Sequence, residues 1–395
     1  AQLGVFAAIA GAFMAKAWGP PVVAALWVTV EWTHSYTGFE WLNLGNTGSD
    51  MLIPLRLAPV TGVWGLSFIF ALMAAVVAAL ILRRQRFASG WLLLLPGLYL
   101  LPPVPAAERG DAGAVVVQPN MDDDTQWSRE LLRMQDEQMK ILSLAAVPSG
   151  APAVDVIVWP EVPAPFYDYD PEFTGLLSSV AKTAHSALLA GVVARAADKA
   201  PLNGALLVDS NGARTGRYDK VNLVPFGEFV PWPFGMLTQK VSTEAGEFEA
   251  GRDIVIPNLG EHKIGTFICY ESVFPSYIRR FAAAGAETLF NISNDSWFGK
   301  SAARYQHLQI VRMRAAENRR WIVRSTNNGI SGVIDPAGRL FKALPEYQEV
   351  SARLQYRYRT DLTVYTRFGD WFVLLCALLT AGAIMSVVLP ARRRL

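Results

Sequence analysis

Three long runs of apolar residues without a single charge constrain the fold more than any other feature of this 395-residue sequence. They cover residues 57–82, 87–107 and 371–390. A helix needs roughly 20 apolar residues to cross a hydrocarbon core about 30 Å thick, and few buried helices of soluble proteins run so far uncharged. We therefore expect membrane-crossing helices here. Two shorter apolar runs, residues 1–15 and 17–30, predict a helical pair.

The charged residues are concentrated in the middle of the chain. Residues 1–104 contain eight, whereas residues 105–370 contain 59, a density close to that of soluble proteins. We therefore predict about four transmembrane helices over residues 1–107, a folded domain over residues 108–370, and a last transmembrane helix with a basic tail over residues 371–395. The middle carries 28 Lys and Arg against 31 Asp and Glu, so it lacks the basic surface that nucleic acids require, and we expect no nucleic-acid partner.

Basic residues beside the apolar runs predict which side of the membrane the domain faces. They are Lys16, Arg83, Arg84, Arg86 and Arg392 to Arg394. Lys and Arg near membrane spans mark the cytoplasmic face, and all three clusters fall on one side if each span crosses once. This arrangement places residues 108–370 on the outer side of the membrane.

Short β-rich runs alternate with segments of helical period between residues 111 and 350. The expected strands are 114–118, 154–159, 188–194, 205–209, 263–269, 287–292, 321–324 and 332–335, and the expected helices are 127–146, 171–184, 275–284 and 302–318. Several strands are apolar on both faces, as in a sheet covered on each side. The sequence therefore predicts an α/β or layered α+β domain.

Three reactive side chains interrupt this pattern. Glu161 and Cys269 come at or directly after apolar strands, and Lys220 lies in a loop that contains Pro and Gly. If the three meet, a thiol could attack a carbonyl while Glu161 takes its proton and Lys220 stabilises the oxyanion, which describes acyl transfer through a thioester. Taken singly, each residue is more typical of a structural role: a buried small side chain, a turn residue and a solvated cation.

Other kinds of site find little support in the sequence. The second cysteine, Cys376, lies in the last apolar run and has no plausible pairing with Cys269. The four histidines have no metal-ligand spacing, and we interpret His307 as a structural residue of its own helix. Since no phosphate-binding glycine motif occurs either, we expect neither a metal nor a cofactor.

The motifs around these residues resemble a known family. The order Glu161, Lys220, Cys269, in the contexts WPE, YDKxxLVPFGE and CYE, is similar to the triad of the carbon-nitrogen hydrolase (nitrilase) superfamily. Further segments resemble the apolipoprotein N-acyltransferases, which complete bacterial lipoprotein maturation. These segments are 38–45, 57–59, 291–299, 306–307, 314–319 and 324–331.

The resemblance implies a nitrilase-like αββα sandwich over residues 108–370, carried on a bundle of membrane helices. It implies transfer of the sn-1 acyl chain of a phospholipid to the N-terminal amine of an S-diacylglyceryl-cysteine apolipoprotein. Glu161 is then the general base, Lys220 the oxyanion-stabilising residue and Cys269 the nucleophile, while Glu228 supports the lysine.

Further residues take roles by the same resemblance. Tyr270 and Glu271 match the pair that follows the nucleophile, and the Tyr270 N–H is expected to be a second oxyanion donor. Trp127, Asn294 and Trp297 are candidate substrate-binding residues. Separately, the loop segment 229–246, rich in Pro, Gly and aromatic residues, is a candidate lid.

The same resemblance implies a multi-pass protein of the bacterial inner membrane with a periplasmic catalytic domain, and we expect a monomer. The family has seven spans before this domain, so we expect about three further spans upstream. Asn222 stands where the family often has His. Two alternatives remain open at this stage, a membrane-anchored amidase and an inactive scaffold that binds lipoproteins.

Overall fold

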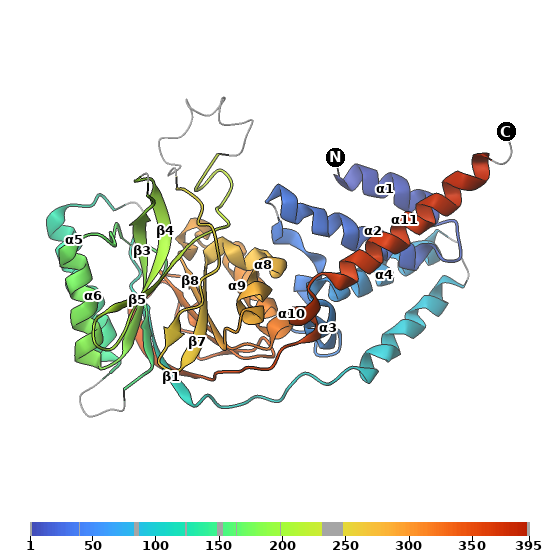
Figure 1. The fold of residues 1–395 in the computed structure, drawn as a ribbon. Helices are drawn as coiled ribbons and strands as arrows, with labels where there is room; N and C mark the ends of the chain where they lie inside the picture. The colour runs from blue at the N-terminus through green and yellow to red at the C-terminus, as the bar shows by residue number, and fades with distance from the viewer. Residues whose placement is uncertain are drawn as a thin grey trace.

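The fold combines a two-sheet domain with a group of apolar helices beside it (Figure 1). The computed structural model describes residues 2–38, 40–82, 87–122, 125–147, 153–162, 164–197, 199–230 and 248–392. The helices at the two ends of the chain lie together on one side of the domain, so chain segments far apart in sequence form a single helical group.

The first sheet has six strands in the order β12-β1-β2-β3-β4-β5. Their bounds are β12 Val350–Tyr356, β1 Ala112–Gln118, β2 Val156–Val158, β3 Ala187–Arg195, β4 Pro201–Val208 and β5 Arg214–Asp219. Strands β1, β2 and β3 are parallel to one another, and the other pairings are antiparallel. The carboxyl end of β2 and the end of β5 deliver Glu161 and Lys220.

The second sheet also has six strands, in the order β11-β10-β9-β8-β7-β6. Their bounds are β11 Leu340–Phe341, β10 Gly332–Ile334, β9 Ile322–Thr326, β8 Thr288–Ser293, β7 His262–Ile268 and β6 Asn258–Leu259. Strands β7, β8 and β9 are parallel. Cys269 directly follows β7 and begins the short helix η6, Cys269–Val273.

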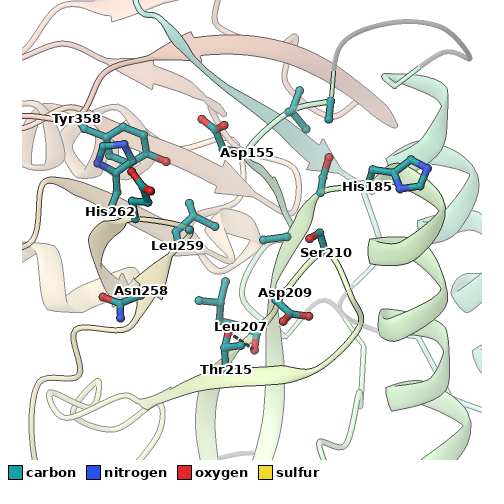
Figure 2. Close-up of a pocket in the computed structure, with 16 residues that line it drawn as sticks. Asp155, His185, Leu207, Asp209, Ser210, Thr215, Asn258, Leu259, His262 and Tyr358 are labelled. Carbon is teal, nitrogen blue, oxygen red and sulfur yellow. Dashed lines mark hydrogen bonds between the residues drawn. The ribbon is translucent and has the colours of Figure 1, made fainter.

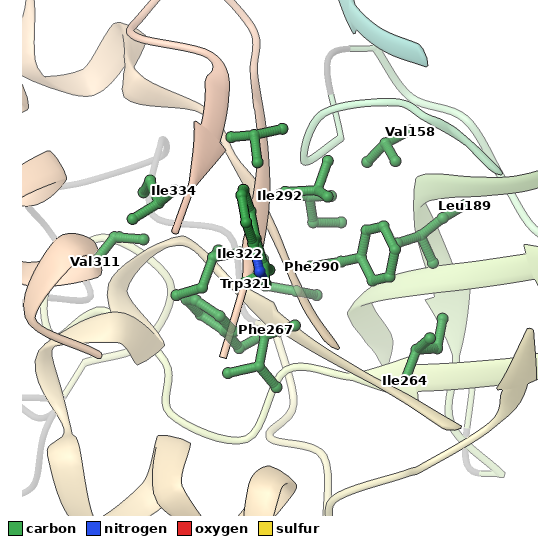
Figure 3. Packing of buried hydrophobic residues seen from close by; sticks show 14 of the residues in the cluster. Val158, Leu189, Ile264, Phe267, Phe290, Ile292, Val311, Trp321, Ile322 and Ile334 are labelled. Carbon is green, nitrogen blue, oxygen red and sulfur yellow. The ribbon is translucent and has the colours of Figure 1, made fainter. Parts of the chain in front are cut away.

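The two sheets pack face to face across one apolar core. Phe290 of β8 and Tyr356 of β12 bring residues of opposite sheets together, with ring centroids 6.0 Å apart. Figure 3 shows part of this cluster, in which Val158 and Leu189 of the first sheet lie near Phe290 and Ile292 of the second. The packing fixes the position of one sheet relative to the other, and with it the distance between the strand ends that carry the polar residues.

Helices cover both outer faces of the sandwich. α5 (Arg129–Ala145) and α6 (Pro171–Ala184) pack on the first sheet, and α8 (Pro275–Ala283) and α9 (Ala303–Asn318) pack on the second. Local sequence signals mark the N-termini of α5 and α6: the Ser128 side chain caps α5, and α6 begins with the cap residue Asp170 followed by Pro171. The predicted α/β class is therefore confirmed, with two sheets.

The strand prediction failed mainly at the sheet edges. β5 was not among the expected strands, but its sequence RTGRYD pairs with β4. The edge strands β6, β11 and β12 were also missed. An edge strand pairs with one neighbouring strand only and is more exposed to solvent. It therefore carries more polar residues and lacks the apolar signature of a central strand.

The apolar helices differ in part from the expected spans. They are α1 (Gln2–Phe13), α2 (Gly19–Thr33), α4 (Val63–Ile81), the 3-10 helix η5 (Ala88–Leu100) and α11 (Trp371–Arg392). Among the described helices, only α4 and the stretch Trp371–Val388 of α11 are long and apolar enough to cross a membrane. The other apolar helices, α1, α2 and η5, have 12, 15 and 13 residues, so about four transmembrane helices before residue 108 stay a prediction.

Two of the predicted apolar runs are only partly covered by one helix, for local reasons: α4 begins later than the run 57–82, and η5 ends earlier than the run 87–107. Gly62 separates the short helix α3 (Ala58–Thr61) from α4, and its φ of 67° is a backbone conformation that suits glycine. Helix η5 ends at Leu100, and Leu101 is extended because Pro102 follows it. Arg83, Arg84, Arg86, Arg393 and Arg394, on which the predicted orientation depends, lie outside the described residues.

A buried junction ties the helical group to the two-sheet domain. The Val63 N–H at the start of α4 donates to Glu317 Oε1 of α9 at 2.8 Å, and Arg314 Nε lies 3.0 Å from Glu317 Oε2. Arg314 also donates to Asn46 Oδ1 at 3.4 Å. The apolar helices therefore hold α9, and α9 in turn contacts the turn that carries Cys269.

Candidate active site

Glu161, Lys220 and Cys269 line one cavity of about 480 Å³ where the ends of the two sheets meet. The remaining lining residues are mainly apolar or aromatic, with a few polar groups among them. They are Trp41, Val162, Asn203, Val224, Gly227, Glu228, Phe248, Tyr270, Asn294, Trp297, Phe298 and Ala303. The structure thus brings the three predicted residues together from two different sheets.

Glu161 is held by three donors and is almost fully buried. Its Oε1 accepts from Lys220 Nζ at 3.1 Å and from Asn203 Nδ2 at 2.8 Å, and its Oε2 accepts from the Asn294 N–H at 2.8 Å. Side-chain and backbone donors on both oxygens fix the plane of this carboxylate. A fixed carboxylate in a cavity can take a proton from a reactant without first reorganising.

Lys220 is the most deeply buried of the charged groups in the cavity, with only 1% of its surface exposed. Its Nζ donates to Glu161 Oε1 and, at 2.9 Å, to Glu228 Oε1. Burial alone would lower the pKa of Lys220, but the Glu161 and Glu228 carboxylates outweigh it and hold the pKa above its ordinary value. The lysine therefore supplies a permanent positive charge at the cavity floor.

Glu228 and Asn203 complete this polar cluster. Glu228 Oε2 accepts from the Val224 N–H at 2.8 Å, and Asn203 Nδ2 donates to both Glu161 and Glu228, at 2.8 and 2.9 Å. Glu228 thus contacts Lys220, the residue that the resemblance expects it to support. Asn203 was missed by the sequence analysis, although a single amide within the apolar strand PLNGALLV was a signal that could have found it.

Cys269 lies at the turn between β7 and η6 with a φ of 48°. A left-handed conformation costs a residue with a side chain about 1–2 kcal/mol, so the surrounding fold must hold it. Burial raises the pKa of the Cys269 thiol above its ordinary value, Glu161 adds to the rise, and Lys220 opposes it. The resting thiol is therefore protonated at neutral pH, and its reaction needs a base beside it.

Glu271 joins the two loops that carry Lys220 and Cys269. Its Oε1 accepts from Tyr218 Oη at 2.5 Å and from the Val221 and Asn222 N–H groups at 2.8 and 3.1 Å. Its Oε2 accepts from the Ile268 N–H at 2.8 Å. Burial raises the pKa of Glu271 to about 7, although these donors oppose the rise. Glu271 therefore has a supporting position behind the cavity rather than on its wall.

One wall of the cavity comes from Trp41, in the segment that links α2 to α4 of the helical group. Trp41 stacks over Tyr270 with ring centroids 6.2 Å apart, and its Nε1 donates to Gln306 Oε1 at 3.0 Å. Tyr270 Oη donates to the Gly38 carbonyl at 2.5 Å. Trp41 was not among the predicted site residues, because its approach depends on how distant parts of the chain pack.

The remaining predicted residues have different positions. Asn294 and Trp297 line the cavity, and Trp297 is 72% exposed at its mouth. Trp127 is not among the described lining residues; it packs against the outer core of the first sheet. The candidate lid, residues 229–246, lies outside the described residues from 231 onwards. Within the described part of the chain, no group of three His, Cys, Asp or Glu residues could hold a metal ion.

A second hollow lies between the sheets, away from these residues (Figure 2). Asp155, His262 and Tyr358 line it, and the His262 and Tyr358 rings stack with centroids 3.7 Å apart. None of the three predicted reactive residues is among the described residues that line it. The chemistry predicted from the sequence therefore belongs to the first cavity.

Comparisons with known proteins show which family the chain belongs to. The chain matches the carbon-nitrogen hydrolase family model over residues 116–360, and the model of the apolipoprotein N-acyltransferase N-terminal domain over residues 1–76. It is 34% identical over 393 residues to the apolipoprotein N-acyltransferase of Geobacter metallireducens, covering 93% of this chain and 74% of that one. The chain belongs to the apolipoprotein N-acyltransferase family.

The Pseudomonas aeruginosa member of the family is 36% identical over 366 residues, covering 88% of this chain and 70% of that one. Among solved structures, an amidase from Nesterenkonia sp. has a TM-score of 0.47 and 17% identity, over 66% of this chain and 94% of that one. A carbon-nitrogen hydrolase from Helicobacter pylori has a TM-score of 0.47 and 18% identity, over 62% and 89%. The resemblance found in the sequence motifs is confirmed, and the chain is a member of an enzyme family.

Proposed function

We propose that this chain transfers an acyl chain from a membrane phospholipid to the N-terminal amine of an S-diacylglyceryl-cysteine apolipoprotein, with Cys269 as the acyl carrier. The observation that carries the proposal is the placement of Glu161, Lys220 and Cys269 in one mainly apolar cavity, with a wall supplied by Trp41 of the helical group. Family membership supports the same reaction.

In the first step, Cys269 Sγ attacks the ester carbonyl of the phospholipid while Glu161 takes the thiol proton. Lys220 Nζ stabilises the oxyanion, as a fixed charge in a buried site is able to do. The C–O bond then breaks, and Glu161 returns the proton to the departing lysophospholipid oxygen. The enzyme is left with a thioester on Cys269.

In the second step, the acceptor amine attacks the thioester. Glu161 takes one amine proton, the C–S bond breaks, and the proton passes to the Cys269 sulfur, so an amide and the free thiol result. One nucleophile serves both substrates in turn, and ping-pong kinetics follow. The Tyr270 N–H is proposed as a second oxyanion donor, Glu228 and Glu271 as supporting residues, and Trp127, Asn294 and Trp297 as substrate-binding residues.

The product of the reaction tests this proposal. The purified full chain is mixed with a phospholipid labelled in its sn-1 acyl chain and a synthetic peptide that begins with S-diacylglyceryl-cysteine. We expect the labelled chain in amide linkage on the peptide, and none on the matched peptide whose amine is acetylated. Release of free fatty acid at a rate comparable to transfer would identify a hydrolase instead, and transfer by Cys269→Ala would refute the thioester route.

We also propose the arrangement in the cell: residues 1–107 as membrane helices, residues 108–370 as the catalytic domain on the periplasmic side of the bacterial inner membrane, and residues 371–395 as a last helix with a cytoplasmic tail. We propose a monomer. Glu261 is exposed and both native cysteines are buried, so Glu261→Cys provides a clean label site. A membrane-impermeant maleimide should label it from outside spheroplasts; labelling only after lysis contradicts the orientation.

A further inference from the structure

His307 lies completely buried beneath the turn that carries Cys269. It is on α9, and its Nε2 is 3.1 Å from the Cys269 carbonyl oxygen and 2.9 Å from Ser272 Oγ. The sequence alone indicates a structural residue of its own helix. That interpretation was wrong, because both ring nitrogens contact residues outside α9.

The second ring nitrogen of His307 contacts a buried ion pair. His307 Nδ1 is 3.1 Å from Asp295 Oδ1, and Arg324 Nη2 is 2.7 Å from Asp295 Oδ2. Burial alone would raise the pKa of Asp295, but Arg324 and then His307 outweigh it and hold the pKa below its ordinary range. Asp295 therefore remains a carboxylate and fixes the ring between itself and the Cys269 turn.

The contact with Cys269 has a geometric consequence. The Cys269 carbonyl oxygen only accepts hydrogen bonds, so His307 holds it in the protonation forms in which Nε2 carries a proton and donates it. The peptide that contains the Cys269 carbonyl also contains the Tyr270 N–H, and in a planar trans peptide the two point in opposite directions. A bond that holds the carbonyl toward α9 therefore holds the N–H away from α9, while Cys269 and Tyr270 both line the cavity.

We propose that His307 is a positioning residue for acyl transfer: by holding the Cys269 carbonyl, it aims the Tyr270 N–H at the oxyanion. Lys220 approaches from the other sheet, so two donors from different elements stabilise the same charge. This inference rests on the proposed function and adds a residue that acts through the backbone.

The test separates oxyanion stabilisation from thiol reactivity. In the purified full chain, we measure the single-turnover rate at which Cys269 takes a labelled sn-1 acyl chain from a phospholipid. We also measure the rate at which iodoacetamide alkylates Cys269, followed on its peptide by mass spectrometry. Alkylation replaces iodide at a saturated carbon and forms no oxyanion, so it is insensitive to the Tyr270 N–H.

His307→Leu should lower the acylation rate about 10²-fold, the usual effect of losing one oxyanion donor. Its alkylation rate should stay within about twofold of wild type. Equal falls in both rates would show general damage to the turn, and unchanged acylation would show that the contact has no function; either result overturns the proposal. Ser272→Ala is the matched control, because it removes the other partner of Nε2, and a loss as large as that of His307→Leu would also overturn it.

Two amide variants test the role of the Nε2 hydrogen bond even if His307→Leu does not fold. A glutamine can place an N–H near the position of Nε2, whereas an asparagine reaches only the position of Nδ1. His307→Gln should recover acylation to within about tenfold of wild type and His307→Asn should not; equal rates refute the proposal.

The failure of the proposed function can be told apart from the failure of this inference. If the wild-type chain takes no label from phospholipid, the proposed donor is wrong. The same variants are then compared with p-nitrophenyl butyrate, an activated ester whose attack by Cys269 forms the same kind of oxyanion. His307→Leu must be slow there too, and an equal rate to wild type overturns the role of His307.

Discussion

Replacing Glu271 with glutamine tests whether this carboxylate joins the two halves of the site. Glu271 accepts four hydrogen bonds, from Tyr218 Oη and from the N–H groups of Val221, Asn222 and Ile268. Glutamine has one acceptor oxygen and one NH₂ group. Even when its oxygen takes the place of Oε1, its NH₂ faces the Ile268 N–H, so one buried donor loses its acceptor.

The magnitude follows from these contacts. An unsatisfied buried N–H costs about 2 kcal/mol, and weakening the other bonds from charged to neutral adds about 1 kcal/mol. For a domain of this size, roughly 3 kcal/mol corresponds to a fall in Tm of about 6–12 °C. Since a displacement of about 1 Å can cost 10²-fold in rate, we expect transfer to the acceptor peptide to fall about 10²-fold well below the Tm.

The assay pairs thermal unfolding with transfer of a labelled acyl chain to the acceptor peptide. Tyr218→Phe is the matched control, because it removes one donor to Glu271 and leaves the three backbone donors in place. We expect it to cost about 1 kcal/mol and to keep transfer within about fivefold. Transfer by Glu271→Gln within threefold of wild type, or equal losses in the two variants, would refute the positioning role.

Three further changes test the cavity itself. Burial and then the Glu161 carboxylate hold the pKa of Cys269 up, so Glu161→Gln should lower that pKa and move the pH midpoint of iodoacetamide alkylation down. Acyl transfer should fall at least about 10³-fold. A midpoint that rises contradicts the cause assigned here. Glu228→Gln removes the carboxylate 2.9 Å from Lys220 Nζ and should lower the rate of acyl transfer about 10²-fold. The control Glu228→Asp keeps the charge and should lower that rate less. A larger loss in Glu228→Asp than in Glu228→Gln contradicts electrostatic support of the lysine. Trp297 is 72% exposed, so Trp297→Ala should leave the Tm within about 1 °C and raise the KM for the phospholipid several-fold. A changed Tm with an unchanged KM would place Trp297 outside the binding surface.

The parts of the fold predicted from the sequence are those with strong local signals. Helix α9 was expected over residues 302–318 and runs from Ala303 to Asn318, and the central strands β7 and β8 were found because both faces of each are apolar. Edge strand β5 was missed because only its pairing with β4 makes it a strand. Helix η5 was expected to be longer, since its apolar residues continue beyond Leu100 while its helical conformation does not.

The candidate site shows the same division. Glu161, Lys220 and Cys269 stood out because each is a reactive group that interrupts the pattern of apolar strands, and family motifs pointed to Glu228. Trp41 and His307 could not be assigned in this way, because their roles depend on contacts between segments that are distant in sequence. Asn203 was missed although a single amide in an apolar strand marked it. The Trp41 ring, for example, reaches the cavity only when the helical group packs against α9. Local sequence identifies the reacting groups, and tertiary packing selects the residues that position them.

The most direct test of the account is the detection of an acyl group on Cys269. The purified chain is incubated with a labelled phospholipid without acceptor and then digested. The mass of the peptide that contains Cys269 is measured by mass spectrometry. The account predicts a mass increase of one acyl chain, removed by hydroxylamine and transferred to an amide when the acceptor peptide is added. An acyl group that persists in Cys269→Ala, or one on Cys269 that never passes to the amine, would contradict it.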